Sequence, residues 1–439
     1  MNRTVKLLVN SGLVAIATLL AGMAIAKLFT ARQVTQQMAI SEGYLAQYPP
    51  QVTSAQGKQI DPVLEAMGLS TIERSTNAVS PQQKEITAAL ANYFDTIHTL
   101  ESGPLPPLPT MVTEYLVRQE NGLKQLQALL QTQPSWAFDA VAIVNPDTGT
   151  DSDPNYSSII ALHSHLLAQS ILAYQTGDRS GQEAAFNAAV NLTRSMATNP
   201  SLTAHILVNV SARHDIAVAR HTNLELTPTD YGQPLIAAAA LDTHIWYMRS
   251  INTFRKQPLG ALSGIGYQYI LALPFTDLLL LTQTNEQKLH NSFYQQLTSA
   301  NLCTVDGDTL PQSYALTPYA VPLRVFHHHV ANALSMELNI LIAEAQQTYR
   351  DTGSWPTVLA SKDSRVCSSA TWHYRVAQAG ISITFDGSLP WLDQQNPPTA
   401  LSYTITSEAM GHSPEELTKK EKRPSGKESS PKPMPFPLH

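Results

Sequence analysis

The chain has 439 residues, of which 43% are hydrophobic and only 14% charged, and its formal net charge is −6. That length allows one large domain or two to three ordinary ones with a full hydrophobic core. The negative charge is spread along the chain, and the part predicted to fold has no basic patch of the kind that binds nucleic acid. Nucleic acid is therefore not an expected partner. Average soluble domains carry about 25% charged residues, and the lower fraction here favours an extracytoplasmic protein.

The first informative stretch is Leu7–Ala26, which contains no charged residue. A helix needs roughly 20 mainly apolar residues to cross a bilayer, so this stretch is predicted to be a transmembrane helix within an anchor over 1–32. Basic residues flank it on both sides, so the positive-inside rule barely discriminates between the two orientations. A short N-terminus usually stays inside, and this predicts a single-pass protein of the bacterial inner membrane with its bulk in the periplasm.

Two other interpretations of the same stretch remain open. Ala24, Ile25 and Ala26 fit the small-x-small pattern of a signal peptide that is cut after Ala26. A buried core helix is the other possibility, although few core helices of this length are apolar on every side. We expect the uncleaved anchor, because the apolar length matches a bilayer.

Helices dominate the predicted folded part. Residues 33–79 have mixed polarity and are predicted to be a stalk or linker, followed by a helical domain over 80–300. Ser80 and Pro81 supply a capping residue and a proline suited to the first helical position. Further helical periodicity on both sides of Gly177 predicts a helical hairpin.

The period of the apolar residues changes in the segment 301–406. Val330–Tyr349 has one apolar stripe at helical spacing. Three short runs after it alternate between apolar and polar residues and predict an antiparallel sheet that packs on this helix. The predicted fold is therefore mainly α, an irregular helical array with hairpins that ends in a small α+β cap. The tail 407–439 is rich in Pro, Ser and Lys and is expected to be disordered.

The chain contains two cysteines, Cys303 and Cys367. Outside the cytoplasm such a pair can form a disulfide. We expect this disulfide if the chain is exported, whereas two free thiols are the alternative.

The segment Leu338–Leu359 carries a partial resemblance to known proteins. Its matching residues are Ala345, Tyr349, Arg350, Gly353, Trp355 and Pro356. This segment is similar to the end of the long helix in type II secretion pseudopilins and in a set of uncharacterised single-pass bacterial envelope proteins. The resemblance implies a helix with a small antiparallel sheet packed on it, and it implies no activity.

Histidine is the residue type that most merits examination as a metal ligand or a catalytic group. His327, His328 and His329 are consecutive, so on a helix their side chains point about 100° apart and cannot converge on one metal ion. They remain weak candidates for metal binding, because such a site would need ligands from elsewhere. No cofactor motif is present.

Two aspartate and histidine pairs are weak catalytic candidates: His214 with Asp215, and Asp242 with His244. Neighbours on one helix do not face each other, so any working pair must form between helices. No nucleophile motif accompanies them.

These observations favour a membrane-anchored scaffold or interaction protein without catalytic activity, which would bind protein partners in the bacterial envelope. One alternative is a periplasmic hydrolase that uses His and Asp from the helices over 163–244. A second alternative is a pseudopilin-related secretion component.

Overall fold

The computed structural model describes most of the chain. The described residues are 3–69, 81–145, 155–226, 232–256, 276–299, 323–359, 363–377, 380–387 and 399–406, together with Cys303, Leu389, Trp391 and Leu392. The Pro/Ser/Lys-rich tail 407–439 and Ser80, the predicted capping residue, lie outside them, and so do the side chains of most residues in the predicted anchor.

Twelve helices and three strands form the described part of the chain, which confirms the mainly α fold with a small C-terminal sheet. In chain order they are α1 (Arg3–Leu45), α2 (Ala55–Ala66), α3 (Pro81–His98), α4 (Thr110–Arg118), α5 (Glu120–Leu129), α6 (Ala140–Val144), α7 (Tyr156–Thr176), α8 (Arg179–Ala197), α9 (Leu202–Thr222), α10 (Gly232–Lys256), α12 (Thr276–Ser299), α13 (Leu323–Thr352), β1 (Thr371–Ala377), β2 (Gly380–Asp386) and β3 (Ser402–Thr406).

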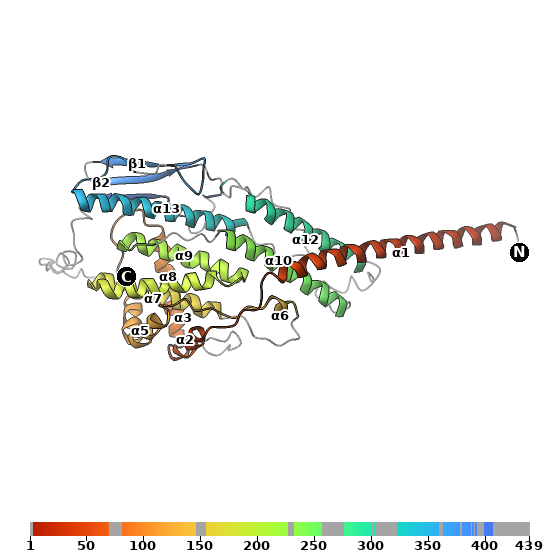
Figure 1. Cartoon of the computed structure of the whole chain (residues 1–439), viewed down its shortest axis with the longest axis horizontal. Coiled ribbons are helices and arrows are strands. Elements are labelled where there is room, and N and C mark those ends of the chain that lie inside the picture. The colour runs from red at the N-terminus through yellow and green to blue at the C-terminus, as the bar shows by residue number, and fades with distance from the viewer. Residues whose placement is uncertain are drawn as a thin grey trace, which may run out of the picture.

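The predicted hairpin is formed by α7 and α8, which pack closely along each other and against α9 (Figure 1). Asn155 caps α7, because its side chain accepts a hydrogen bond from the Ser158 N–H at 3.2 Å. Gly177 ends α7 in the left-handed region, with φ of 79°, a conformation that glycine adopts without a steric penalty. These helices build the largest hydrophobic core together with α2 to α5.

Helix α1 projects from the body, with the N-terminus at its far end (Figure 1). Its last part is buried: Val34, Met38 and Leu45 pack with residues of α6 and α10. Part of the segment that the sequence predicts to be a linker, 33–79, is therefore folded, and α2 belongs to the largest core. The apolar pattern in this segment is weak because several buried positions carry polar or small residues, namely Gln37, Ser41 and Gly57.

The sheet covers one face of α13, as the period change predicts (Figure 1). Its strands are antiparallel in the order β1-β2-β3, with Trp372 opposite Phe385 and Ile383 opposite Tyr403. Cys303 and Cys367 form the expected disulfide, which joins the same core. Val376 departs from the predicted alternation and is 51% exposed, because it lies at the hairpin end of the edge strand β1.

Leu7–Ala26 forms the first half of α1. Among the helices, as far as their residues are described, none has the length and apolar character needed to cross a bilayer. The transmembrane anchor stays a prediction.

Candidate functional site

The interior of the helical body is unusually rich in histidine. Ten of the chain's fourteen histidines are buried: His98, His163, His165, His205, His214, His221, His244, His290, His327 and His329. Burial disfavours the imidazolium form, so it lowers the pKa of His98 to about 3 and the pKa values of His165 and His205 to about 4. These three imidazoles are therefore neutral at physiological pH.

Asp215 pairs with a histidine of another helix. One carboxylate oxygen lies 2.9 Å from Nε2 of His163 on α7, and the other accepts a hydrogen bond from the Thr193 hydroxyl on α8, also at 2.9 Å. The side chains of His163 and Asp215 are 1% and 4% exposed. The contact therefore joins α7, α8 and α9 inside the core, with no open face toward a substrate.

His214 is the neighbour of Asp215 but faces a different environment. Its ring stacks on Phe94 of α3, with 4.8 Å between the ring centroids. Burial, followed by the nearby His163 and Arg213, holds its pKa well below the ordinary value. His214 and Asp215 therefore do not act as a pair, although each lies next to His163: Asp215 through the contact with Nε2, and His214 through ring stacking.

The second predicted pair, Asp242 and His244 on α10, lies in another cluster. Nδ1 of His244 is 2.9 Å from the Ser41 hydroxyl of α1, and its ring stacks on Tyr44 with 4.4 Å between centroids. Burial raises the pKa of Asp242 to about 6, a shift that a hydrogen bond with Trp246 reduces. The four catalytic candidates are thus divided between two packing clusters.

The three consecutive histidines are separated as helical geometry requires. His327 stacks on Trp391 at 4.5 Å between centroids with nearly parallel rings, and His329 is buried. Within the described ranges, no group of three or more His, Cys, Asp or Glu side chains is placed to hold a metal ion.

A polar seam runs between α9 and α13. The Asn332 side chain donates a hydrogen bond to the Asn209 carbonyl at 2.7 Å, and Asn339 donates to the Ile216 carbonyl at 2.8 Å. From the first hydrogen bond to the second, the position advances by seven residues on α9 and by seven residues on α13, so the two helices run in the same direction at this contact. Side-chain amides thus fix the register of two buried helices, as polar residues do at coiled-coil seams.

Arg220 of α9 adds a buried positive charge to this contact between α9 and α13. Its side chain donates to Oδ1 of Asn339 and to Oγ of Ser335, each at 2.7 Å, and its guanidinium lies 5.7 Å from the centre of the Tyr403 ring. Arg220 is 5% exposed. Burial lowers its pKa to about 10, so it stays charged at neutral pH.

A cavity of about 660 Å³ lies where the C-terminal ends of α9 and α13 meet, and Arg220 lines it. We call it the α9–α13 cavity. Arg350 lines it from the last turn of α13, and Arg365 from the segment before β1. Glu225 and Glu344 are its acidic lining residues. The basic lining residues therefore outnumber the acidic ones by three to two.

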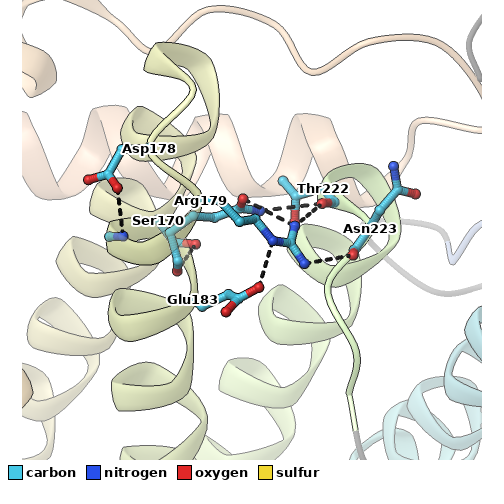
Figure 2. Close-up of polar contacts among 8 residues, drawn as sticks. Ser170, Asp178, Arg179, Glu183, Thr222 and Asn223 are labelled. Carbon is cyan, nitrogen blue, oxygen red and sulfur yellow. Dashed lines mark hydrogen bonds and ion pairs between the residues drawn. The ribbon is translucent and has the colours of Figure 1, made fainter. Parts of the chain in front are cut away.

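Two sets of polar contacts hold the walls of this cavity. Arg179 joins the start of α8 to the end of α9: its Nε donates to Glu183 at 2.6 Å, and its terminal nitrogens lie 3.5 Å from the carbonyl oxygens of Thr222 and Asn223 (Figure 2). On the opposite side, the Glu337 carboxylate accepts hydrogen bonds from the backbone N–H groups of Arg365 and Val366 at 2.6 and 3.0 Å. It also accepts from Ser364 and Trp372.

The sequence analysis did not single out Arg220, Asn332 or Asn339. Asn332, Ser335 and Asn339 follow the apolar stripe of α13 at spacings of three and four, which is a detectable sign of a buried polar contact. The partner helix is not visible in that pattern, because the seam joins residues more than 110 positions apart.

No known protein family, curated protein or solved structure matches this chain.

Proposed function

We propose that this protein is a membrane-anchored extracytoplasmic scaffold or interaction protein of the bacterial envelope, held at the inner membrane by Leu7–Ala26 and without catalytic activity. The observation that carries the proposal is the character of α1. It is a single helix of 43 residues that begins before the predicted anchor and ends inside the folded body.

The exposure of α1 changes sharply along its length. Ile25, Leu28 and Phe29 are 68%, 72% and 55% exposed, whereas Val34 is 4% exposed. Large apolar side chains gain about 1.5–3 kcal/mol each on leaving water, so a projecting apolar helix end favours contact with a lipid or protein surface. Lys27 and Arg32 suit the headgroup layer at the end of such a span.

Helix geometry gives the distance between bilayer and body. Thr30 is buried and lies four residues after Ala26, which is about 6 Å at 1.5 Å per residue. The proposed anchor would therefore hold the body directly against the membrane surface, without a long spacer. This arrangement suits a protein whose partners are also membrane proteins.

The buried polar groups favour a scaffold over an enzyme. Asp215, His163 and Thr193 satisfy one another inside the core, and His244 packs against α1. A hydrolase that uses these residues remains the alternative, because the His163 and Asp215 contact has the geometry of a base and its orienting acid. That alternative requires an opening of the α7–α9 core and a nucleophile.

A relationship to pseudopilins is the second alternative. It is supported by the sheet on α13, which follows the segment Leu338–Leu359. Processing of the N-terminus by a prepilin peptidase would favour it.

The anchor can be tested by charge insertion. Arginine costs about 2.5–3.5 kcal/mol at the centre of a membrane helix, so the double variant Ile16→Arg/Leu20→Arg loses about 5–7 kcal/mol of insertion free energy. The matched control is Ile40→Arg, which places arginine at a 49% exposed position on the same helix, outside the anchor.

We expect the unmodified chain and Ile40→Arg to resist alkaline carbonate extraction and to be digested by protease added to spheroplasts. The double variant should be extracted and protected. Release of the folded body by cleavage after Ala26 would contradict the anchor. The same fractionation of the unmodified chain, the control and the double variant would contradict it as well. For chains that retain their fold, His214→Ala and His244→Ala should keep any partner, whereas loss of a turnover would favour the hydrolase.

A further inference from the structure

The α9–α13 cavity contains a buried charge that the described residues leave without a counter-ion. Arg220 is nearly fully buried, and its hydrogen-bond acceptors are the neutral groups of Asn339 and Ser335. No carboxylate in the described ranges forms an ion pair with it. Buried charges in proteins are normally paired or bound to ions, because neutral acceptors only partly replace water.

Two more arginines lie around the same cavity. Arg350 and Arg365 are exposed, and they approach it from α13 and from the segment that Glu337 holds in place. A guanidinium offers a planar fork of donors that matches the oxygens of a carboxylate or phosphate. Three such groups therefore line one cavity, and the buried Arg220 is one of them.

The acidic lining residues do not neutralise Arg220. Glu225 is exposed and Glu344 is half-buried, and neither contacts the Arg220 guanidinium within hydrogen-bond distance. The net charge of the lining is positive, which raises the local concentration of anions.

The rest of the cavity wall is partly apolar. Leu224, Leu226 and Ile342 line it, and its volume of about 660 Å³ lies in the range of small-molecule sites, roughly 300–1,000 Å³. A bare inorganic ion would fill little of that volume, whereas an anion with a short hydrocarbon part would use the charged and the apolar walls together.

We propose that the α9–α13 cavity binds a small organic oxyanion whose carboxylate or phosphate group pairs with Arg220 and whose short apolar part lies against Leu224 and Ile342. Arg350 and Arg365 bind the outer oxygens of that group. This inference is independent of the membrane anchor, because every residue in it belongs to the folded body.

The test is isothermal titration of the full chain in a non-ionic detergent with four probes: hexanoate, hexyl phosphate, inorganic phosphate and hexanol. We expect saturable binding of at least one of the two hexyl anions, at least tenfold tighter than hexanol and inorganic phosphate. The tighter of the two anions identifies the head group as carboxylate or phosphate.

Three variants locate the binding. Arg350→Ala and Arg365→Ala change exposed side chains and should each weaken it about tenfold, since hydrogen bonds between charged groups are among the strong ones. Arg118→Ala removes an exposed arginine of α4 outside the cavity and should leave the affinity unchanged.

Arg220→Lys keeps the charge but loses the fork of donors, and it should weaken binding at least as much as the outer variants. Its folding is checked by its unfolding midpoint. The proposal is overturned if no hexyl anion binds at 10 mM (roughly the weakest affinity worth assigning to a site). Equal binding of hexanol, or an equal loss in Arg118→Ala, overturns it as well.

Discussion

Asp215→Ala is the change that best separates a structural from a catalytic role for the buried aspartate. The substitution removes the acceptor for His163 and for the Thr193 hydroxyl, both at 2.9 Å in a site that is closed to solvent. Each buried polar group left without a partner costs about 1–3 kcal/mol, and this substitution leaves two such groups, the His163 ring and the Thr193 hydroxyl. We therefore expect the free energy of unfolding to fall by about 2–6 kcal/mol.

The assay is equilibrium unfolding in urea, followed by circular dichroism at neutral pH. Glu120→Ala is the control, because it removes an acid from a solvent-exposed pair with Lys124, where little or no loss of stability is expected. Thr193→Val completes a double-mutant cycle with Asp215→Ala, and a coupling energy of about 1 kcal/mol or more is expected between residues in contact. A loss below about 1 kcal/mol for Asp215→Ala, equal to that of the control, would refute the reasoning.

Three further predictions concern stability. The pKa values of His98, His165, His205, His221 and His244 are lowered by burial, to about 3 for His98 and about 4 for the others. Between the unfolded pKa of about 6.5 and these values the unfolded chain binds more protons, so stability should fall as pH falls through this window, by up to about 1.4 kcal/mol per pH unit and histidine. Asp242, whose pKa is raised to about 6, opposes this trend. A urea midpoint that stays constant from pH 7 to pH 5 would contradict the predicted loss of stability. Reduction of the disulfide should lower the free energy of unfolding by about 4 kcal/mol, because the bond closes a loop over a sequence separation of 64. An unchanged midpoint in dithiothreitol would count against this. Asn339→Leu leaves Arg220 without one acceptor and should cost about 2–3 kcal/mol in the same assay, with Gln347→Leu on the exposed side of α13 as the control.

Local chemistry made several parts of the fold predictable. The apolar stripe of Val330–Tyr349 and the alternation after it predict α13 and the sheet, because burial on one face imposes the period of the element. The disulfide followed from an even cysteine count. The position of the α7–α8 hairpin followed from Gly177, where the turn requires a left-handed residue.

The candidate site could not be predicted in the same way. A pattern along one helix shows which side is buried but not which helix covers it. Asp215 meets His163 across 52 residues, and Arg220 meets Asn339 across 119 residues. The buried end of α1 was missed for the same reason: its packing depends on α10 and α6, which occur much later in the chain.

The measurement that tests the proposed scaffold most directly is purification of the full-length protein from gently solubilised membranes, with mass spectrometry of its partners and of its own N-terminus. We predict an uncut N-terminus and at least one membrane protein present in stoichiometric amount. A chain that is cut after Ala26, recovered without the membrane and without a partner, would contradict the proposed function.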